Sequence, residues 1–340
     1  MSDLVKSLMG GGWSLVIGWI LPVFLSLQLI TLLILPEVHD SAAIERFLQQ
    51  PASSRQITLL AIAAVVGLVL AAAQAPLYRV LEGYALWPSK IADIRIDKHK
   101  ARKKKLVAKY NSIADTDRGV RAGLMYERAS RYPSAERQFA PTSLGNAIRR
   151  FETYAGDRYQ LDSQLLWHNL IAVAPPQAVS AVDKARASVD FFICLLYGGV
   201  ATALLAFVVC ISGNVDARSV AAIGIGILIS ISCYRLAVLA TDEWDAAVRA
   251  VVDHGRTGLA AAFGLAIPDN LADERYMWRV VNTLVRREFI YSESKDIAVK
   301  LQRFKAPSPN GPRSVTAPRN GTPRSIGSAK SLAKRRTRKG

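Results

Sequence analysis

The sequence predicts an all-α integral membrane protein with four transmembrane helices, a helical cytoplasmic domain and a disordered basic C-terminal tail. Three observations lead to this fold class. Residues 13–35 include no charged side chain, and a helix of that length crosses a hydrocarbon core of ~30 Å. Three further apolar stretches follow along the chain. The formal net charge of +17, from 44 basic and 27 acidic residues, indicates an anionic partner.

The apolar stretches are arranged as two helical hairpins. Pro22 lies inside the first span, and we expect it to kink that helix. Gly224 and Gly226 lie inside the last span, where small residues let two helix backbones approach closely. The four spans are expected at 13–35, 57–77, 191–211 and 220–239.

Polar segments separate and follow these hairpins and complete the domain organisation. Within them, Leu144, Ile148, Phe151 and Ala155 recur at helical spacing and predict one buried helix face. The predicted parts are an N-terminal tail with hairpin 1 over 1–77, a basic cytoplasmic helical domain over 78–187, hairpin 2 over 188–239, a cytoplasmic helical segment over 240–296 and a disordered basic tail over 297–340.

A dense run of basic residues follows the second span. Because cytoplasmic loops carry the excess of lysine and arginine, the run places its side of the membrane in the cytoplasm. With four spans, both termini then lie on that side. We expect the run to contact anionic lipid, at roughly 1 kcal/mol per basic side chain. The predicted contact residues are Lys98, Lys100, Arg102, Lys103, Lys104 and Lys105.

Few polar side chains fall in or beside the spans. Asp190 and Arg235 lie at similar depths on the third and fourth spans and form a candidate ion pair. Gln28, Thr31 and Gln74 are the positions that could line a pathway through an oligomer. Just after the fourth span, an acidic group is typical of a solvated helix face; its members are Asp242, Glu243 and Asp245.

The motifs of common catalytic sites are missing from the sequence. It contains no serine–histidine–acid set, no Cys-x-x-Cys or His-x-x-x-His pair, no P-loop and no dinucleotide fingerprint. We therefore predict a protein that is not an enzyme, with no cofactor and no metal site. Glu82 is the one carboxylate whose position just outside the second span attracts interest. The cysteines Cys194, Cys210 and Cys233 lie in apolar stretches, where we expect buried thiols.

Three stretches, LYRVLEGYALWP at 77–88, PTSLGNAIRRFETYAGDRYQLDSQLLW at 141–167 and FGLAIPDNLADERYMW at 263–278, resemble segments of multi-pass bacterial membrane proteins common in actinobacteria. The resemblance covers about half of the chain. Gln160 stands where that family has glycine. The resemblance implies a bacterial inner, or plasma, membrane. The family has no known activity, so no functional residue is carried over from it.

These features leave three functional hypotheses. The first is a non-catalytic scaffold or signalling component, whose cytoplasmic part binds a protein partner, or a second copy of itself, together with anionic lipid. The second is a small oligomeric channel or transporter, although no charge is predicted near the middle of a span, where coupled transport usually needs one. The third and weakest is a membrane tether for nucleic acid, which would bind in a salt-dependent way.

Overall fold

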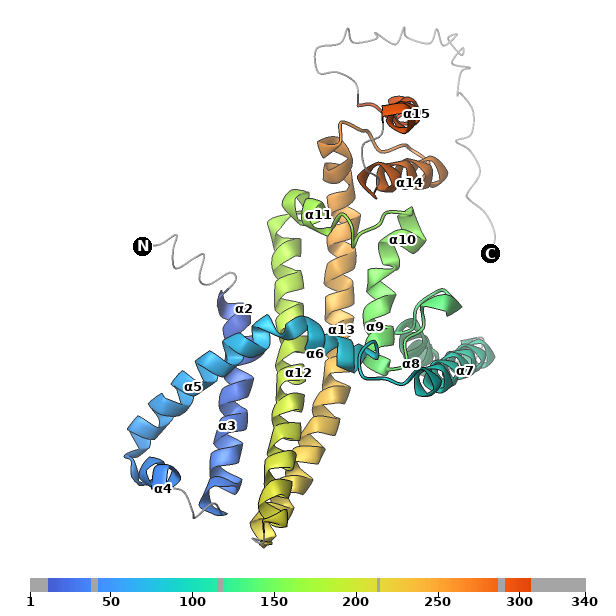
Figure 1. Ribbon diagram of the computed structural model, residues 1–340. Helices are drawn as coiled ribbons and strands as arrows, with labels where there is room; N and C mark the ends of the chain where they lie inside the picture. The colour runs from blue at the N-terminus through green and yellow to red at the C-terminus, as the bar shows by residue number, and fades with distance from the viewer. Residues whose placement is uncertain (1–11, 38–41, 115–118, 213–214, 287–290, 307–340) are drawn as a thin grey trace, which may run out of the picture. The chain divides into compact units, whose positions relative to one another are not determined.

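A computed structural model describes residues 12–37, 42–114, 119–212, 215–286 and 291–306 (Figure 1). Every regular element in these ranges is helical; an isolated bridge between Leu265 and Lys305 is the single strand-like pairing recorded there. The predicted all-α class is therefore confirmed. Four of the described helices are long and apolar enough to cross a membrane, and their bounds are Trp13–Glu37, Ala52–Ala72, Pro176–Ile211 and Ala217–Ala262.

The first of these four segments changes helix type along its length. It consists of α2 (Trp13–Leu15), the π-helical η2 (Val16–Ile20), α3 (Leu21–Leu33) and the 3-10 turn η3 (Leu35–Glu37). Pro22 lies at the start of α3, directly after the π-helical turn. Proline has no N–H, and its ring crowds the preceding turn, which is why the sequence predicted a kink. In the structure the preceding turn is a wider π-helical turn, which makes room for the ring.

The second apolar segment ends earlier than the sequence predicts. After the short α4 (Ala42–Gln49), α5 runs over Ala52–Ala72 and stops at Ala73. A separate helix, α6 (Gln74–Glu82), follows at once. Pro76 cannot donate a backbone hydrogen bond to the preceding turn, which favours a break at this point. Gln74 therefore belongs to α6 and not to a continuous span.

The third and fourth apolar segments are parts of two much longer helices. α12 (Pro176–Ile211) has 36 residues and α13 (Ala217–Ala262) has 46, so at ~1.5 Å per residue they measure about 54 Å and about 69 Å. Figure 1 shows them running side by side. An added Cβ at Gly226 would lie 2.5 Å from the carbonyl oxygen of Gly199, whereas one at Gly224 would meet no atom within 4 Å. Of the two predicted close-packing glycines, Gly226 alone lies against α12.

Shorter helices pack around the extended ends of α12 and α13. α9 begins after Thr142, whose hydroxyl accepts a hydrogen bond from the Gly145 N–H at 2.9 Å. α6 ends at Gly83, which has φ +96°, a conformation that glycine adopts without strain. The remaining helices are α7 (Ser89–Ala114), α8 (Gly119–Ser130), the 3-10 helix η4 (Glu136–Gln138), α9 (Ser143–Glu152), α10 (Tyr154–Tyr159), α11 (Trp167–Val173), α14 (Leu271–Arg286) and α15 (Tyr291–Gln302).

The main hydrophobic core lies where these shorter helices meet α12 and α13. The predicted apolar face is buried, with Leu144 of α9 and Ala155 of α10 at 0% exposure. The predicted burial is thus confirmed, while the single predicted helix is divided into two at Thr153. Trp278 and Met277 of α14 and Val251 of α13 are also fully buried in the same core.

The start of the predicted disordered tail belongs to this fold. Residues 297–302 continue α15, and the Ile297 and Phe304 side chains are buried. The Ala266 N–H donates to the Phe304 carbonyl at 2.8 Å, and the Ala306 N–H donates to that of Gly264 at 3.0 Å. The predicted boundary at residue 297 was therefore too early, because the Ile297 and Phe304 side chains are buried in the fold. The rest of the predicted tail, 307–340, lies outside the described residues.

Candidate functional site

One exposed face of α7 combines apolar and basic side chains. Six residues at spacings of three or four share this face, which we call the α7 face. Its first two members, Ile91 and Ile94, are 50% and 68% exposed. The four that follow are exposed cations that form no ion pair within the described residues. The members of the α7 face are Ile91, Ile94, Lys98, Arg102, Lys105 and Lys109.

The six predicted lipid-contact residues differ in the contacts they make. Lys98, Arg102 and Lys105 belong to the α7 face, while the other three pair with other groups of the protein. Lys103 Nζ donates to the Pro133 carbonyl at 2.7 Å. Lys100 pairs with Asp97 at 3.6 Å, and Lys104 pairs with Glu136 at 3.4 Å.

Asp190 is buried where α12 meets α6, and it has partners that the sequence did not indicate. Its Oδ1 accepts hydrogen bonds from the Tyr78 hydroxyl at 2.6 Å and from Gln74 Nε2 at 3.0 Å. The predicted ion pair with Arg235 is not formed among the described residues. A neighbouring helix supplies neutral donors in place of a cation from α13.

The three predicted pathway residues are each engaged in a hydrogen bond. Gln74 donates to Asp190, and Gln28 and Gln56 pair through their side-chain amides, joining α3 to α5. Thr31 donates to the Leu27 carbonyl one turn earlier at 2.8 Å. Each of these side chains is thus bonded to another group of the protein.

A ladder of arginine and aspartate side chains ties the shorter helices to α13. Asp242 accepts from Arg131 Nη2 at 2.7 Å and from Arg150 Nη2 at 3.1 Å. Arg150 lies 3.3 Å from Asp245, which also pairs with Arg249 at 2.8 Å. The prediction of a solvated acidic face was wrong for Asp242 and Asp245, because Arg131 and Arg150 come from distant segments to meet them. Glu243, the third member, is exposed.

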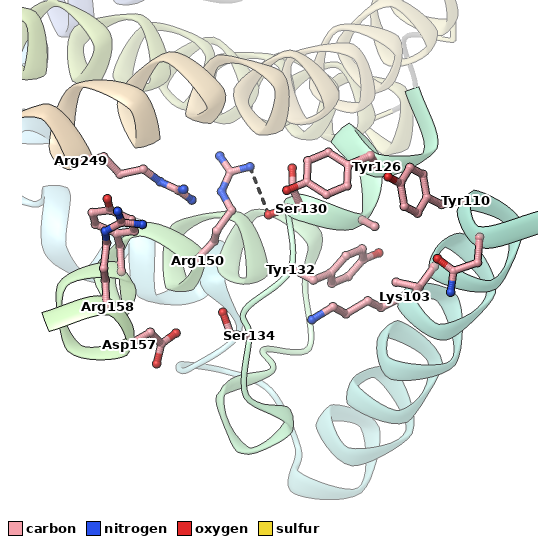
Figure 2. A pocket seen from close by; sticks show the side chains of 14 residues that line it. Lys103, Tyr110, Tyr126, Ser130, Tyr132, Ser134, Arg150, Asp157, Arg158 and Arg249 are labelled. Atoms are coloured by element: carbon pink, nitrogen blue, oxygen red, sulfur yellow. Dashed lines mark hydrogen bonds between the residues drawn. The ribbon is translucent and has the colours of Figure 1, made fainter. Parts of the chain in front are cut away.

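A pocket of about 600 Å³ opens beside this ladder (Figure 2). We call it the Arg150 pocket. α7, α8, α9, α10 and α13 all contribute to its walls. Figure 2 shows Lys103 and Arg249 reaching toward it from different sides. Its charged and tyrosine side chains are Lys103, Arg150, Arg158, Arg249, Asp157, Tyr110, Tyr126, Tyr132 and Tyr154.

Two further pockets adjoin each other around Trp244. They measure about 630 and 340 Å³ and share Phe151, Glu152, Arg186 and Trp244 as lining residues. Glu82 lines the smaller pocket. Burial, and next the nearby Glu152 carboxylate, raise the pKa of Glu82 to about 7. Burial also raises the pKa of Glu152. The Glu82 carboxyl group can therefore exchange a proton near neutral pH.

Comparisons with known family models, curated proteins and solved structures find no match to this chain. In the described part of the chain, no group of three or more histidine, cysteine, aspartate or glutamate side chains is placed to hold a metal ion. All three cysteines are free thiols.

Several side chains of these sites carry no local sequence signal. Tyr78 and Asp190 are separated by 112 residues, and Arg131 and Asp242 by 111. Tyr154 and Tyr159 both donate to Asp253, at 3.0 and 2.8 Å. A weak signal existed for the Arg150 pocket, since its cations and tyrosines are dense in residues 103–158, but no fixed spacing connects them.

Proposed function

We propose that this chain is a multi-pass protein of a bacterial inner membrane that acts as a non-catalytic scaffold or signalling component. In this proposal the shorter helices form a cytoplasmic part that binds a protein partner, or a second copy of the chain, and rests on anionic lipid. The α7 face is the observation that carries the proposal. Isoleucines can enter the interfacial region there while the following cations meet lipid phosphates.

The exposed side chains of the four apolar segments support the membrane assignment. A water-facing helix presents polar side chains outward, yet these segments expose leucine, isoleucine and valine along their apolar parts. On α13 this exposed apolar surface reaches Leu239 and is followed by the charged ladder. Exposed members include Leu32, Ile57, Val65, Val69, Leu204, Phe207, Ile211, Leu228 and Ile231.

The continuity of α12 and α13 supports a signalling or scaffolding role over a purely anchoring one. Each helix passes without a break from its apolar half into the core formed with α9, α11 and α14. No flexible linker separates the two halves, so a displacement of the proposed cytoplasmic part is transmitted to the hairpin.

Hydrogen exchange of the full chain in lipid nanodiscs tests the lipid contact. With anionic lipid we expect slower exchange in α7 than with zwitterionic lipid. The variant K98Q/R102Q/K105Q/K109Q should lose this difference. A control with as many charges removed from exposed sites elsewhere, R121Q/R128Q/K184Q/K300Q, should keep it. Equal exchange of α7 in both lipids would reject the role of the α7 face.

Protease accessibility tests the membrane assignment and its orientation. The proposal places the basic tail inside the cell, so trypsin should remove it in inverted membrane vesicles and leave it intact in sealed right-side-out vesicles. Release of the whole protein from membranes by alkaline carbonate would reject the four-span arrangement. Capture of the same partner by the wild-type chain and by a variant lacking its cytoplasmic helices would reject the scaffold.

The alternative of a small oligomeric channel or transporter has less support. It needs polar side chains that face a pathway, and Gln28, Thr31 and Gln74 are bonded to other protein groups. Ion flux through liposomes containing the purified protein separates the two functions. Flux that is lost on substitution of Gln28 would favour the channel.

A further inference from the structure

We propose that the Arg150 pocket binds the phosphoryl group of a small molecule or of a lipid headgroup. The site is distinct from the α7 face and does not depend on the proposed scaffold role. Its volume of about 600 Å³ is within the range of small-molecule sites. Four cationic side chains and a single carboxylate, Asp157, line it.

Two of the pocket arginines, Arg249 and Arg158, are each held through the Nε atom by a neighbouring side chain, which leaves their terminal donors unused. Arg249 gives its Nε to Asp245, and its terminal nitrogens have no hydrogen-bond partner among the described residues. Arg158 gives its Nε to the Tyr159 hydroxyl in the same way. A planar guanidinium whose two terminal nitrogens are both unused suits a phosphate oxygen pair.

The buried Arg150 side chain has a hydrogen-bond donor without a partner, which is a second observation in favour of a ligand. The residue is 8% exposed, and its side-chain Nε has no hydrogen-bond partner although the atom is buried. Buried polar atoms are normally paired, so an orphaned donor calls for an explanation. Its position on the wall of a cationic pocket fits a site whose occupant adds negative charge and acceptors nearby.

The rest of the lining suits the organic part of the same ligand. Four tyrosines line the pocket, and the Arg249 guanidinium lies 4.6 Å from the Tyr154 ring centre. Tyr110 and Tyr126 are in ring contact at 5.6 Å. Aromatic walls give a flat or apolar group contact area while the cations hold its phosphate. Because α7 contributes Lys103 to the pocket, a headgroup arriving from the membrane surface and a soluble phosphate compound are both chemically suitable.

Isothermal titration calorimetry of the full chain in non-ionic detergent tests the site, with inorganic pyrophosphate as the probe. We expect saturable binding that R158E and K103Q each weaken at least tenfold. R121E removes an arginine of the neighbouring α8 that lies outside the pocket, and it should stay within twofold of wild type. S134W narrows the pocket without changing its charge and should also weaken binding, which separates a shaped site from general attraction.

A competition arm distinguishes the two sources of phosphate. If short-chain phosphatidic acid in the micelles displaces pyrophosphate and diacylglycerol does not, the pocket accepts a lipid headgroup. If ADP competes and phosphatidic acid does not, it accepts a soluble compound.

Absence of saturable binding of all three phosphates would overturn the proposal. Equal weakening by R158E and R121E would also overturn it, because the +17 chain would then be attracting anions without a site. Thermal unfolding of each variant verifies that it is folded.

Discussion

The Tyr78 hydroxyl donates a 2.6 Å hydrogen bond to Asp190, and this contact joins α6 to α12 beside the apolar hairpins. Asp190 is 6% exposed and Tyr78 is 8% exposed, so both polar groups depend on protein partners. Tyr78 also packs its ring edge-on against Trp244 of α13 at 6.4 Å. One side chain thus connects three helices. Burial and the neighbouring Asp190 raise the pKa of Tyr78, which keeps its proton in place for this bond.

Replacing Tyr78 with phenylalanine removes the donor and keeps the ring. We expect the free energy of unfolding to fall by about 1.5–3 kcal/mol, because a hydrogen bond to a buried carboxylate is lost while its acceptor stays buried. Unfolding in mixed micelles, followed by tryptophan fluorescence, measures the change. Tyr126→Phe is the control, since Tyr126 is 62% exposed and should change stability by less than about 0.5 kcal/mol. Equal stability of Y78F and wild type would show that the bond is not needed.

The features of the fold that depend on local composition can be predicted from the sequence. Apolar runs revealed the four long helices, and residues at helical spacing revealed the buried face of α9. The sequence also contains the cause of the wrong end predicted for the second segment. Pro76 disfavours a continuous helix at this point, but the apolar residues around it led to a predicted span that extends to residue 77.

The partners of the buried charges could not be predicted in this way. The sequence predicted Asp190 and Arg235 at similar depths on adjacent spans, yet α6 supplies Tyr78 and Gln74 from more than a hundred residues away. Asp242 and Asp245 have the spacing of any exposed acidic face. Their pairing with Arg150 depends on the packing of the whole core, which brings that arginine close to both carboxylates. Long-range pairing of charges follows from tertiary structure and has no periodic signal.

The Arg150–Asp242–Asp245 ladder should be a major contributor to the stability of the core. Arg150→Met removes a cation that is 93% buried at the side chain, while Arg131 and Arg249 stay paired with Asp242 and Asp245. We expect the free energy of unfolding to drop by about 2 kcal/mol, less than the ~3–5 kcal/mol of a buried pair left with an unpaired charge, because each carboxylate keeps one arginine. Lys104→Met breaks the exposed pair with Glu136 and should cost less than about 1 kcal/mol. Similar losses in both variants, measured by the same unfolding assay, would contradict a special role for the ladder.

The crossing of α12 and α13 should be sensitive to a single methyl group at Gly226. A Cβ there would lie 2.5 Å from the Gly199 carbonyl oxygen and 2.9 Å from the Ala203 nitrogen, both of which are backbone atoms. Gly226→Ala should therefore force the helices apart and cost about 1–3 kcal/mol. Gly224→Ala is a matched control two residues away, where a Cβ meets no atom within 4 Å. Its stability should equal or slightly exceed that of wild type, since alanine favours helix. A larger loss at Gly224 than at Gly226 would contradict this packing.

Glu82 should make stability fall as the pH rises. Its pKa is about 7 in the folded protein and near 4.5 when unfolded, because burial and the Glu152 carboxylate outweigh the attraction of Arg149 and Arg79. Between those values the folded chain holds a proton that the unfolded chain has lost. Its contribution to stability is therefore present at low pH and is lost as the pH rises through about 7.

Glu82→Gln removes this proton exchange. At pH 8 the variant should be more stable than wild type by about 1 kcal/mol, a value reduced for solvent screening because Glu82 is partly exposed. Its stability should also depend less on pH between 4.5 and 7, although Glu152, whose pKa is raised by burial, keeps part of the slope. Unfolding measured at half-unit steps of pH tests both expectations. Glu243→Gln, at an exposed site on α13, is the control and should keep the wild-type slope. If E82Q kept that slope too, the proton would have to be held elsewhere in the molecule.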